Sequence, residues 1–194
     1  MLAQRSAMRY DREGDQHYDL LSALQKSIRG SDPDAAVYYL GRLLAAGDLL
    51  SPCRRLLVIA AEDVGLAYPM IIPIVKAAVD AAQMLGLPEA RLPLADAVVL
   101  VATSPKSNSA YMAINNALEL VRETGNLPVP LHLRNAPTKL MKQLGYGEKY
   151  KYAHDYPGNF VKQQFLPDEL KDRRIWEPQL NPAEQKHKER MHDK

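Results

Sequence analysis

The apolar positions in the first two thirds of the chain recur at intervals of three and four residues, the spacing of a helix face. One such run extends over residues 15–30, and Asp15 is a candidate cap for it. A second run extends over 33–47. There Asp32 is a candidate N-cap, Pro33 suits the first helical position and Gly47 is a stop signal. Two separate helices are therefore predicted.

Four more helices are predicted by the same reasoning. Ser51-Pro52 is a second start signal, for a helix that ends near Gly65, and the next two helices cover residues 69–85 and 88–103. Ser104-Pro105 is expected to start the last helix, which continues to Gly125. Six helices joined by short turns predict an all-α bundle.

The pattern changes after residue 125. Residues 127–131 alternate proline with apolar residues and must be extended, because each proline disfavours the helical region for the residue before it. A short helix over 137–144 is predicted, ended by Gly145-Tyr146-Gly147. The rest of 126–180 is rich in tyrosine and proline without a sustained period, and we expect it to wrap over the bundle. Residues 182–194 are charged without an apolar face, which indicates a frayed helix or a disordered tail.

Composition limits the class of protein. Of the 194 residues 46% are apolar, which favours a packed globular chain. The single cysteine, Cys53, excludes an internal disulfide and fits a reducing cytoplasm. No apolar run, residues 97–102 included, approaches the ~20 residues that span a bilayer. No secretory signal is evident at the N-terminus, so a soluble, cytoplasmic protein is expected.

The charge distribution singles out the last third of the chain. The formal net charge is only +2, but residues 139–194 hold 12 basic and 9 acidic side chains, against 13 and 14 in residues 1–138. Basic and aromatic side chains alternate between Arg122 and Tyr156, which are the ingredients of single-strand DNA binding. Packing of the tyrosines on a core is the alternative explanation. The candidate DNA-binding residues are Arg122, Arg134, Lys139, Lys142, Tyr146, Lys149, Tyr150 and Lys151.

Two patterns resemble enzyme sites. Residues 56–63 end in Glu62-Asp63, like the magnesium-binding strand of P-loop ATPases, but no glycine-rich phosphate loop ending in Gly-Lys-Ser/Thr accompanies them. Ser104-Pro105-Lys106-Ser107 lacks the glycines. We therefore interpret the acids as the solvated end of an amphipathic helix and predict no catalytic or cofactor-binding residue.

The histidines suggest a remote alternative, a metal-dependent phosphohydrolase that uses His132, His154 and Asp155. Metal ligands of such enzymes come from converging helices, whereas these three residues lie in irregular, proline-rich sequence. No metal site is predicted.

An ordered set of motifs resembles the MgsA/RarA family of AAA+ ATPases, the bacterial relatives of the Werner-helicase-interacting ATPase. The most specific stretch is Pro128–Lys142, followed by Leu144–Gly147 and Tyr152–Asp155. The resemblance extends from about Arg9 to Trp176. The other matching segments, in order, are Tyr10-Asp11, Gly14-Asp15, His17–Asp19, Lys26–Ala36, Ala61–Ala67 and Ser104–Asn108.

The resemblance implies a fold and a role. It implies that the chain is a fragment that begins near the end of a helical lid, and that the ATPase module, with its ATP and Mg²⁺ sites, lies in the absent part. The remainder is expected to resemble the C-terminal collar of clamp loaders and to form homotetramers. The expected organisation is a linker (1–14), a helical oligomerisation domain (15–125), a segment packed on the bundle (126–180) and a charged tail (181–194).

The family's complete proteins act on DNA at stalled forks and single-stranded ends, with single-strand binding protein and replication or recombination factors as partners, and a nucleoid-associated location is implied. The preferred hypothesis is an oligomerisation module without enzyme activity. The alternative is a DNA- or protein-docking module that acts through residues 122–156. Association of copies is expected because apolar residues of 67–104 cover more than one side of their helices, although the interface residues themselves are not predicted. These apolar residues are Ile71, Ile72, Ile74, Val75, Val79, Val98, Val99, Leu100 and Val101.

Overall fold

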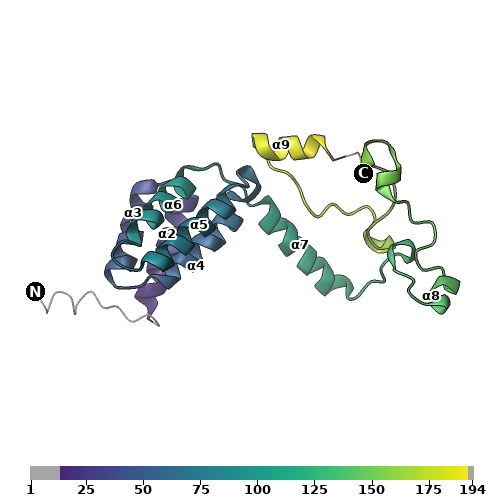
Figure 1. The fold of residues 1–194 in the computed structure, drawn as a ribbon, viewed down its shortest axis with the longest axis horizontal. Coiled ribbons are helices and arrows are strands. Elements are labelled where there is room, and N and C mark those ends of the chain that lie inside the picture. Colours follow the sequence, from purple (N-terminus) through teal and green to yellow (C-terminus); the bar gives the residue numbers. More distant parts are fainter. Residues whose placement is uncertain (1–13, 192–194) are drawn as a thin grey trace, which may run out of the picture. The chain divides into compact units, whose positions relative to one another are not determined.

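A computed structural model describes residues 14–191 (Figure 1). Those residues contain helices and turns but no strand, which confirms the all-α prediction. Contacts between residues divide the chain into two compact units. The first, here called the bundle unit, comprises residues 1–113 and 176–194, and the second, here called the Tyr-rich unit, comprises residues 114–175. The predicted linker, residues 1–14, lies outside the described residues except for Gly14.

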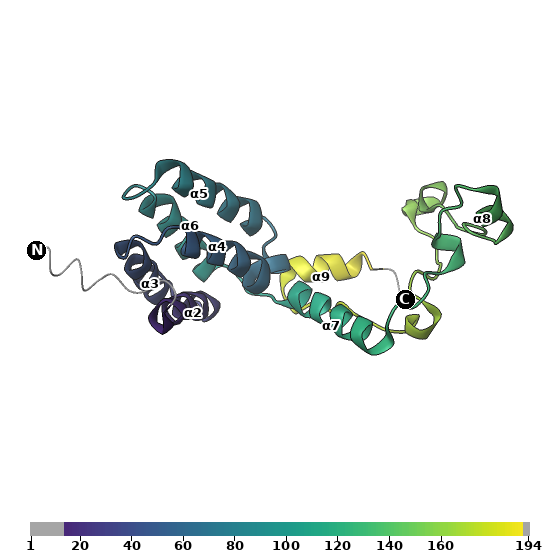
Figure 2. The same ribbon diagram turned by 90° about the horizontal axis from the view of Figure 1, so that it is seen from below.

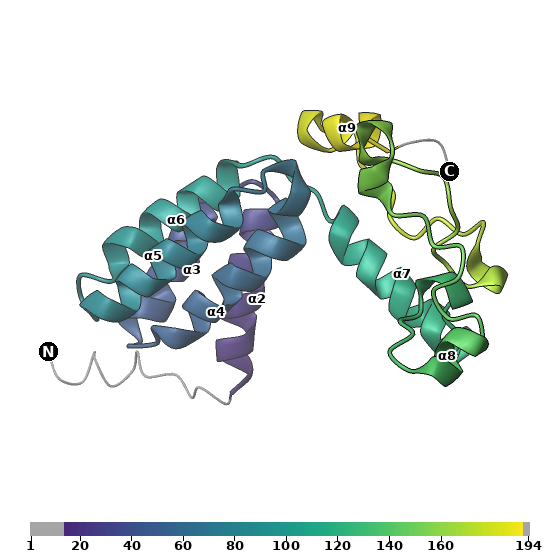
Figure 3. The same ribbon diagram turned by 45° about the vertical axis from the view of Figure 1, so that its right-hand side comes forward.

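Five α-helices make up most of the bundle unit (Figures 1 and 2). α2 packs against α3, and α6 packs against both α3 and α5. Figure 3 shows α5 and α6 lying side by side. The helices are α2 (Asp15–Arg29), α3 (Pro33–Ala45), α4 (Leu50–Ile59), α5 (Ile71–Leu85) and α6 (Arg91–Thr103).

The helix signals at residues 32–47 are confirmed. The side chain of Asp32 accepts a hydrogen bond from the Ala35 N–H at 2.9 Å, and Pro33 is the first residue of α3. Gly47 follows the helix with φ +81°, a conformation that favours glycine. The prediction that Ser51 caps α4 is wrong. α4 begins at Leu50, and the Asp48 carboxylate accepts from the Ser51 N–H at 3.2 Å.

α4 does not end simply at a glycine. It continues into a π-helical turn (Ala60–Val64) and a 3₁₀ turn (Gly65–Ala67). Gly65 has φ +47°, and a Cβ atom there would lie 3.2 Å from the backbone oxygen of Ser107. A glycine is therefore needed where the chain passes close to the segment that follows α6.

Most of the apolar residues of 67–104 from which association was expected are buried in the core of the bundle unit instead. Ile71, Val75, Val79, Val98 and Val101 are buried, and only Ile72 and Val99 of this set are exposed. α5 and α6 face other helices on more than one side, which explains why their sequences are apolar on more than one side.

α7 (Ser109–Thr124) differs from the prediction in two ways: it starts later in the sequence, and its apolar positions are exposed. Residues 104–108 are not helical, and the Ser107 N–H donates to the backbone oxygen of Asp63 at 2.8 Å. The helix therefore starts five residues later than Ser104-Pro105 indicated. The apolar positions Ile114, Leu118 and Val121 are 56%, 50% and 55% exposed, so α7 does not bury this stripe in a core.

The Tyr-rich unit consists of most of α7, short helical turns and extended segments. The predicted helix at 137–144 is confirmed as the shorter α8 (Lys139–Gln143), which Thr138 caps. The 3₁₀ turns are Leu131–Leu133, Ala153–Asp155, Pro157–Asn159 and Asp168–Leu170. Residues 126–130 are non-helical, as the prolines require. The packing of residues 126–175 on the bundle stays a prediction.

The chain returns to the bundle unit at Trp176. The indole N–H of Trp176 donates to the Ser109 hydroxyl at 3.1 Å, and the Gln179 amide donates to Asn108 at 2.7 Å. α9 (Pro182–Glu189) follows, so of the two alternatives for the tail, a frayed helix or disorder, the structure has a helix. Its Asn181 cap accepts from the Glu184 N–H at 2.9 Å. Glu184 is fully buried, which gives the helix an anchor that its charged sequence does not reveal.

Candidate functional site

The predicted basic and aromatic residues lie in the Tyr-rich unit, but on different local structures. Lys139 and Lys142 are on α8, and Arg122 is in the last turn of α7. Lys149, Tyr150 and Lys151 follow the turn after α8 and are exposed. Whether these side chains bind DNA stays a prediction.

Arg134 and Tyr146 hold the local fold together. The Arg134 Nε donates to the Val129 backbone oxygen at 2.7 Å, and its Nη1 donates to the Tyr146 hydroxyl at 3.1 Å. The guanidinium carbon also lies 5.0 Å from the centroid of the Tyr146 ring. Since their polar groups are engaged within the chain, these two residues have a structural role here.

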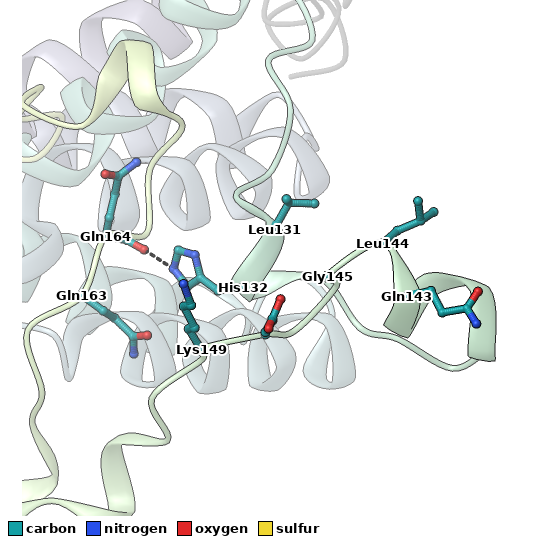
Figure 4. Close-up of a pocket in the computed structure, with 9 residues that line it drawn as sticks. Leu131, His132, Gln143, Leu144, Gly145, Lys149, Gln163 and Gln164 are labelled. Carbon is teal, nitrogen blue, oxygen red and sulfur yellow. Dashed lines mark hydrogen bonds between the residues drawn. The ribbon is translucent and has the colours of Figure 1, made fainter.

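A hollow of about 550 Å³ opens beside α8 (Figure 4). Figure 4 shows the His132 ring pointing to the backbone oxygen of Gln164, a distance of 2.7 Å. Lys149 is the only member of the predicted DNA-binding set that lines it. The lining residues are Leu131, His132, Gln143, Leu144, Gly145, Glu148, Lys149, Gln163 and Gln164.

The histidines considered as metal ligands contact other residues of the chain and lie in separate segments. His132 is engaged with Gln164, whereas His154 and Asp155 lie in a separate 3₁₀ turn, where the His154 ring is 5.1 Å from that of Tyr152. Among residues 14–191, no three or more His, Cys, Asp or Glu side chains are grouped so that they could hold a metal ion.

The Glu62-Asp63 pair is not a solvated helix end. Asp63 is only 5% exposed and accepts from the Arg29 Nε at 2.6 Å, and Glu62 accepts from the Arg29 Nη2 at 3.2 Å. The hydrogen bond to Asp63 raises the pKa of the Arg29 guanidinium. Gln25 approaches both carboxylates at 3.4 Å. The π-helical turn directs both acids toward α2, so this expectation from the sequence is wrong.

The Lys106-Ser107 pair also has a structural explanation. The Lys106 ammonium donates to the backbone oxygens of Ala102 and Ser104 at 2.9 and 2.6 Å, and so caps the end of α6. Burial lowers the pKa of this ammonium. The Ser107 hydroxyl donates to the buried carboxylate of Glu184. Sequence reasoning missed Glu184 because its partner is 77 positions away.

A second hollow, of about 370 Å³, lies beside these groups in the bundle unit. Arg29, Glu62, Lys106 and Asn108 line it, together with other residues of the same network. Three of the motif segments quoted above, Lys26–Ala36, Ala61–Ala67 and Ser104–Asn108, therefore meet in one polar network.

Comparison with known proteins decides the family. The family model described as "MgsA AAA+ ATPase C terminal" matches residues 30–194, and a model described as "AAA C-terminal domain" matches residues 1–29. The chain belongs to the MgsA AAA+ ATPase C-terminal family. None of the described helices of this chain is long and apolar enough to cross a membrane.

Several curated relatives are similar over nearly the whole chain. Replication-associated recombination protein A of Bacillus subtilis is 52% identical over 175 residues, which are 90% of this chain and 42% of the relative. The protein of the same name from Escherichia coli K12 is 47% identical over 90% of this chain and 39% of its own length. The ATPase WRNIP1 of Dictyostelium discoideum is 38% identical over 99% of this chain and 22% of its own length. The chain thus spans less than half the length of each of these relatives.

Proposed function

We propose that this chain is an oligomerisation module that organises the subunits of a replication-associated AAA+ ATPase around DNA. The observation that carries the proposal is the absence of buried residues from the Tyr-rich unit. All of residues 114–175 are described, and none of them is buried. A folded unit with no buried residue lacks the apolar burial that stabilises other domains of its size.

The Tyr-rich unit nevertheless contains many large apolar side chains. On α7 these form a stripe at helical spacing, Ile114, Leu118 and Val121. Exposed apolar surface of this extent marks a site of association. Identical copies can cover such surfaces symmetrically, and a homotetramer is the expected assembly. The other exposed large apolar residues are Val129, Leu131, Leu140, Leu144, Tyr150, Tyr152, Tyr156, Phe160 and Phe165.

Light scattering of the purified chain tests the proposal. The expected mass is a multiple of 21.7 kDa at micromolar concentration. Leu118→Asp with Val121→Asp should lower the mass toward one chain, because two carboxylates would lie in the covered stripe. Met84→Asp is the matched control, since Met84 is apolar and 88% exposed but lies on α5 in the bundle unit. A monomeric parent chain would contradict the proposal.

An oligomerisation module of this kind needs no ATPase activity of its own. No Gly-Lys-Ser/Thr phosphate loop occurs in the sequence, and Glu62 is paired with Arg29. The chain alone should therefore show no Mg²⁺-dependent ATP turnover. Turnover that Glu62→Gln abolishes would show that this carboxylate has a catalytic role instead.

A second candidate function is DNA docking through residues 122–156. Lys139, Lys142 and Lys149 are exposed, and no ion pair within residues 14–191 engages them. Tyr150 and Tyr152 are also exposed, on the segment after α8, where rings could stack on bases. Free ammonium groups near such rings favour phosphate and base contact over a purely structural role.

Fluorescence anisotropy with single-stranded DNA over a salt series tests this second function. Changing Lys139, Lys142 and Lys149 to Glu should weaken binding and flatten its salt dependence, because fewer counterions are released. The matched control changes Lys162, Lys171 and Arg173 to Glu, three exposed cations of the same unit outside residues 122–156. Equal losses for both triple variants would indicate non-specific attraction only.

A further inference from the structure

The hollow beside α8 is built from three segments that hold one another. The Gly147 N–H donates to the Leu131 backbone oxygen at 2.9 Å, and His132 contacts the Gln164 oxygen at 2.7 Å. The Gln163 amide donates to the Lys151 oxygen at 2.8 Å and accepts from the Lys151 N–H at 3.2 Å. The frame of the hollow is thus fixed by bonds within the chain.

The turn that carries the charged residues of the hollow has an unusual backbone. Gly145 and Gly147 have φ of +79° and +74°, and Lys149 has φ +64°, in the left-handed region that residues with a Cβ atom rarely adopt. A Cβ atom on Gly145 would lie 3.3 Å from the Glu148 Oε2, so this carboxylate oxygen lies over the glycine. Ser31 and Asn159 also have a positive φ, so this backbone supports a site only together with the side chains that the turn presents.

Three polar side chains of the hollow remain available to a ligand. Among the described residues, no hydrogen bond or ion pair engages the Gln143 amide, the Glu148 carboxylate or the Lys149 ammonium. Leu131 and Leu144 add two partly exposed apolar side chains from separate segments (Figure 4). The hollow therefore offers one cation, one anion, one amide and apolar walls.

This combination matches a nucleotide of a single strand. A base has apolar ring faces for leucine side chains, and an edge whose amino group donates to a carboxylate, while the adjacent phosphate attracts an ammonium group. The volume of about 550 Å³ lies within the ~300–1,000 Å³ of small-molecule sites. We infer that this hollow receives one unstacked base that carries an exocyclic amino group, with Glu148 on the amino group and Lys149 on the phosphate. The inference rests on the DNA-docking function proposed above.

The base preference of the whole chain tests the role of Glu148. Anisotropy titrations should show that oligo(dC) binds at least about fivefold more tightly than oligo(dT) of equal length, because thymine carries two carbonyl oxygens and no amino group at its edge. Glu148→Gln should remove most of this difference. The same backbone with abasic sites should bind more weakly than oligo(dC), and Glu148→Gln should change its affinity no more than that of oligo(dT), through charge alone.

Lys149→Gly tests the phosphate contact without disturbing the turn, since glycine adopts a positive φ without strain. It should weaken binding and lower the salt slope by about one unit. Lys162→Gly removes one exposed cation outside the hollow and should have a smaller effect.

Three results would overturn the inference, and they are distinguishable. Salt-dependent DNA binding with equal oligo(dC) and oligo(dT) affinities, insensitive to Glu148→Gln, would leave DNA docking intact without this site. No DNA binding at all would remove both proposals. A Glu148→Gln chain with altered mass in light scattering but unaltered DNA affinity would assign the hollow to a contact between copies.

Discussion

Glu184 shows how a single residue can tie distant parts of the chain together. Its carboxylate is fully buried and accepts from the Ser107 hydroxyl and, at 2.6 Å, from the Gln179 N–H. Burial acts to raise the pKa of Glu184, but these hydrogen bonds outweigh it and hold the pKa below its ordinary value. The ionised form is therefore the one that the folded bundle unit stabilises.

Because the pKa of Glu184 is lowered in the folded state, the stability of the bundle unit should fall as the pH falls. Its stabilisation is fully present above the unfolded pKa of about 4.3 and is lost as pH falls through the lower folded value. Urea unfolding between pH 3 and pH 7 should show this loss, and the loss should be smaller in Glu184→Gln. Glu184→Ala should destabilise at pH 7 by ~1–3 kcal/mol for each donor left unsatisfied. Identical pH profiles for parent and Glu184→Gln would contradict this account.

At the scale of helices, sequence signals located elements better than they located ends. The start of α3 at Asp32-Pro33 and its end near Gly47 were predicted correctly, because capping is local and needs only neighbouring residues. Ser104-Pro105 failed because residues 104–108 are held by Asp63 and by Glu184, which are remote in sequence. The helical spacing of Ile114, Leu118 and Val121 does not show that this face of α7 lacks a core in the single chain.

The same distinction applies to the candidate site. The basic and aromatic segment was recognisable from composition, yet the hollow beside α8 depends on Gln163 and Gln164, which lie outside the predicted segment 122–156. The hydrogen bond between Arg134 and Tyr146 could not be predicted, because residue type alone does not reveal a partner. The ion pair between Arg29 and Asp63 could not be predicted from the sequence either, because two acidic residues at the end of a helix are usually exposed to solvent.

The cap of α3 gives a prediction at the element scale. Asp32→Ala removes the acceptor for the Ala35 N–H and should destabilise the bundle unit by ~1 kcal/mol. Asp34→Ala is the matched control, because Asp34 lies in the first turn but is not the capping residue, and it should cost less. Thermal unfolding measures both, and a larger loss for Asp34→Ala would contradict the assignment of the cap.

At the scale of the whole chain, the two units differ in what stabilises them. The buried apolar cluster extends from Leu20 to Ala102 and lies entirely in the bundle unit. The Tyr-rich unit has hydrogen bonds and turns but no buried residue. If association supplies its missing burial, its stability must depend on protein concentration.

Hydrogen exchange at two protein concentrations tests this dependence. Amides of residues 114–175 should exchange faster at nanomolar than at micromolar concentration, because dilution dissociates the copies that cover them. The helices α2 to α6 serve as an internal control and should exchange equally at both concentrations. Concentration-independent exchange in 114–175 would show that the unit is stable without a partner.

The bond between Trp176 and Ser109 has a consequence for engineering the chain. Both residues belong to the bundle unit, so the chain leaves this unit after residue 113 and re-enters it beside its point of departure. Residues 114–175 therefore resemble an inserted domain, because the chain segments before and after them both belong to the bundle unit. Replacing them with a short glycine-serine linker should leave a folded, monomeric protein whose cooperative unfolding resembles that of the intact bundle. Loss of cooperative unfolding would mean that the bundle unit needs residues 114–175 in order to fold.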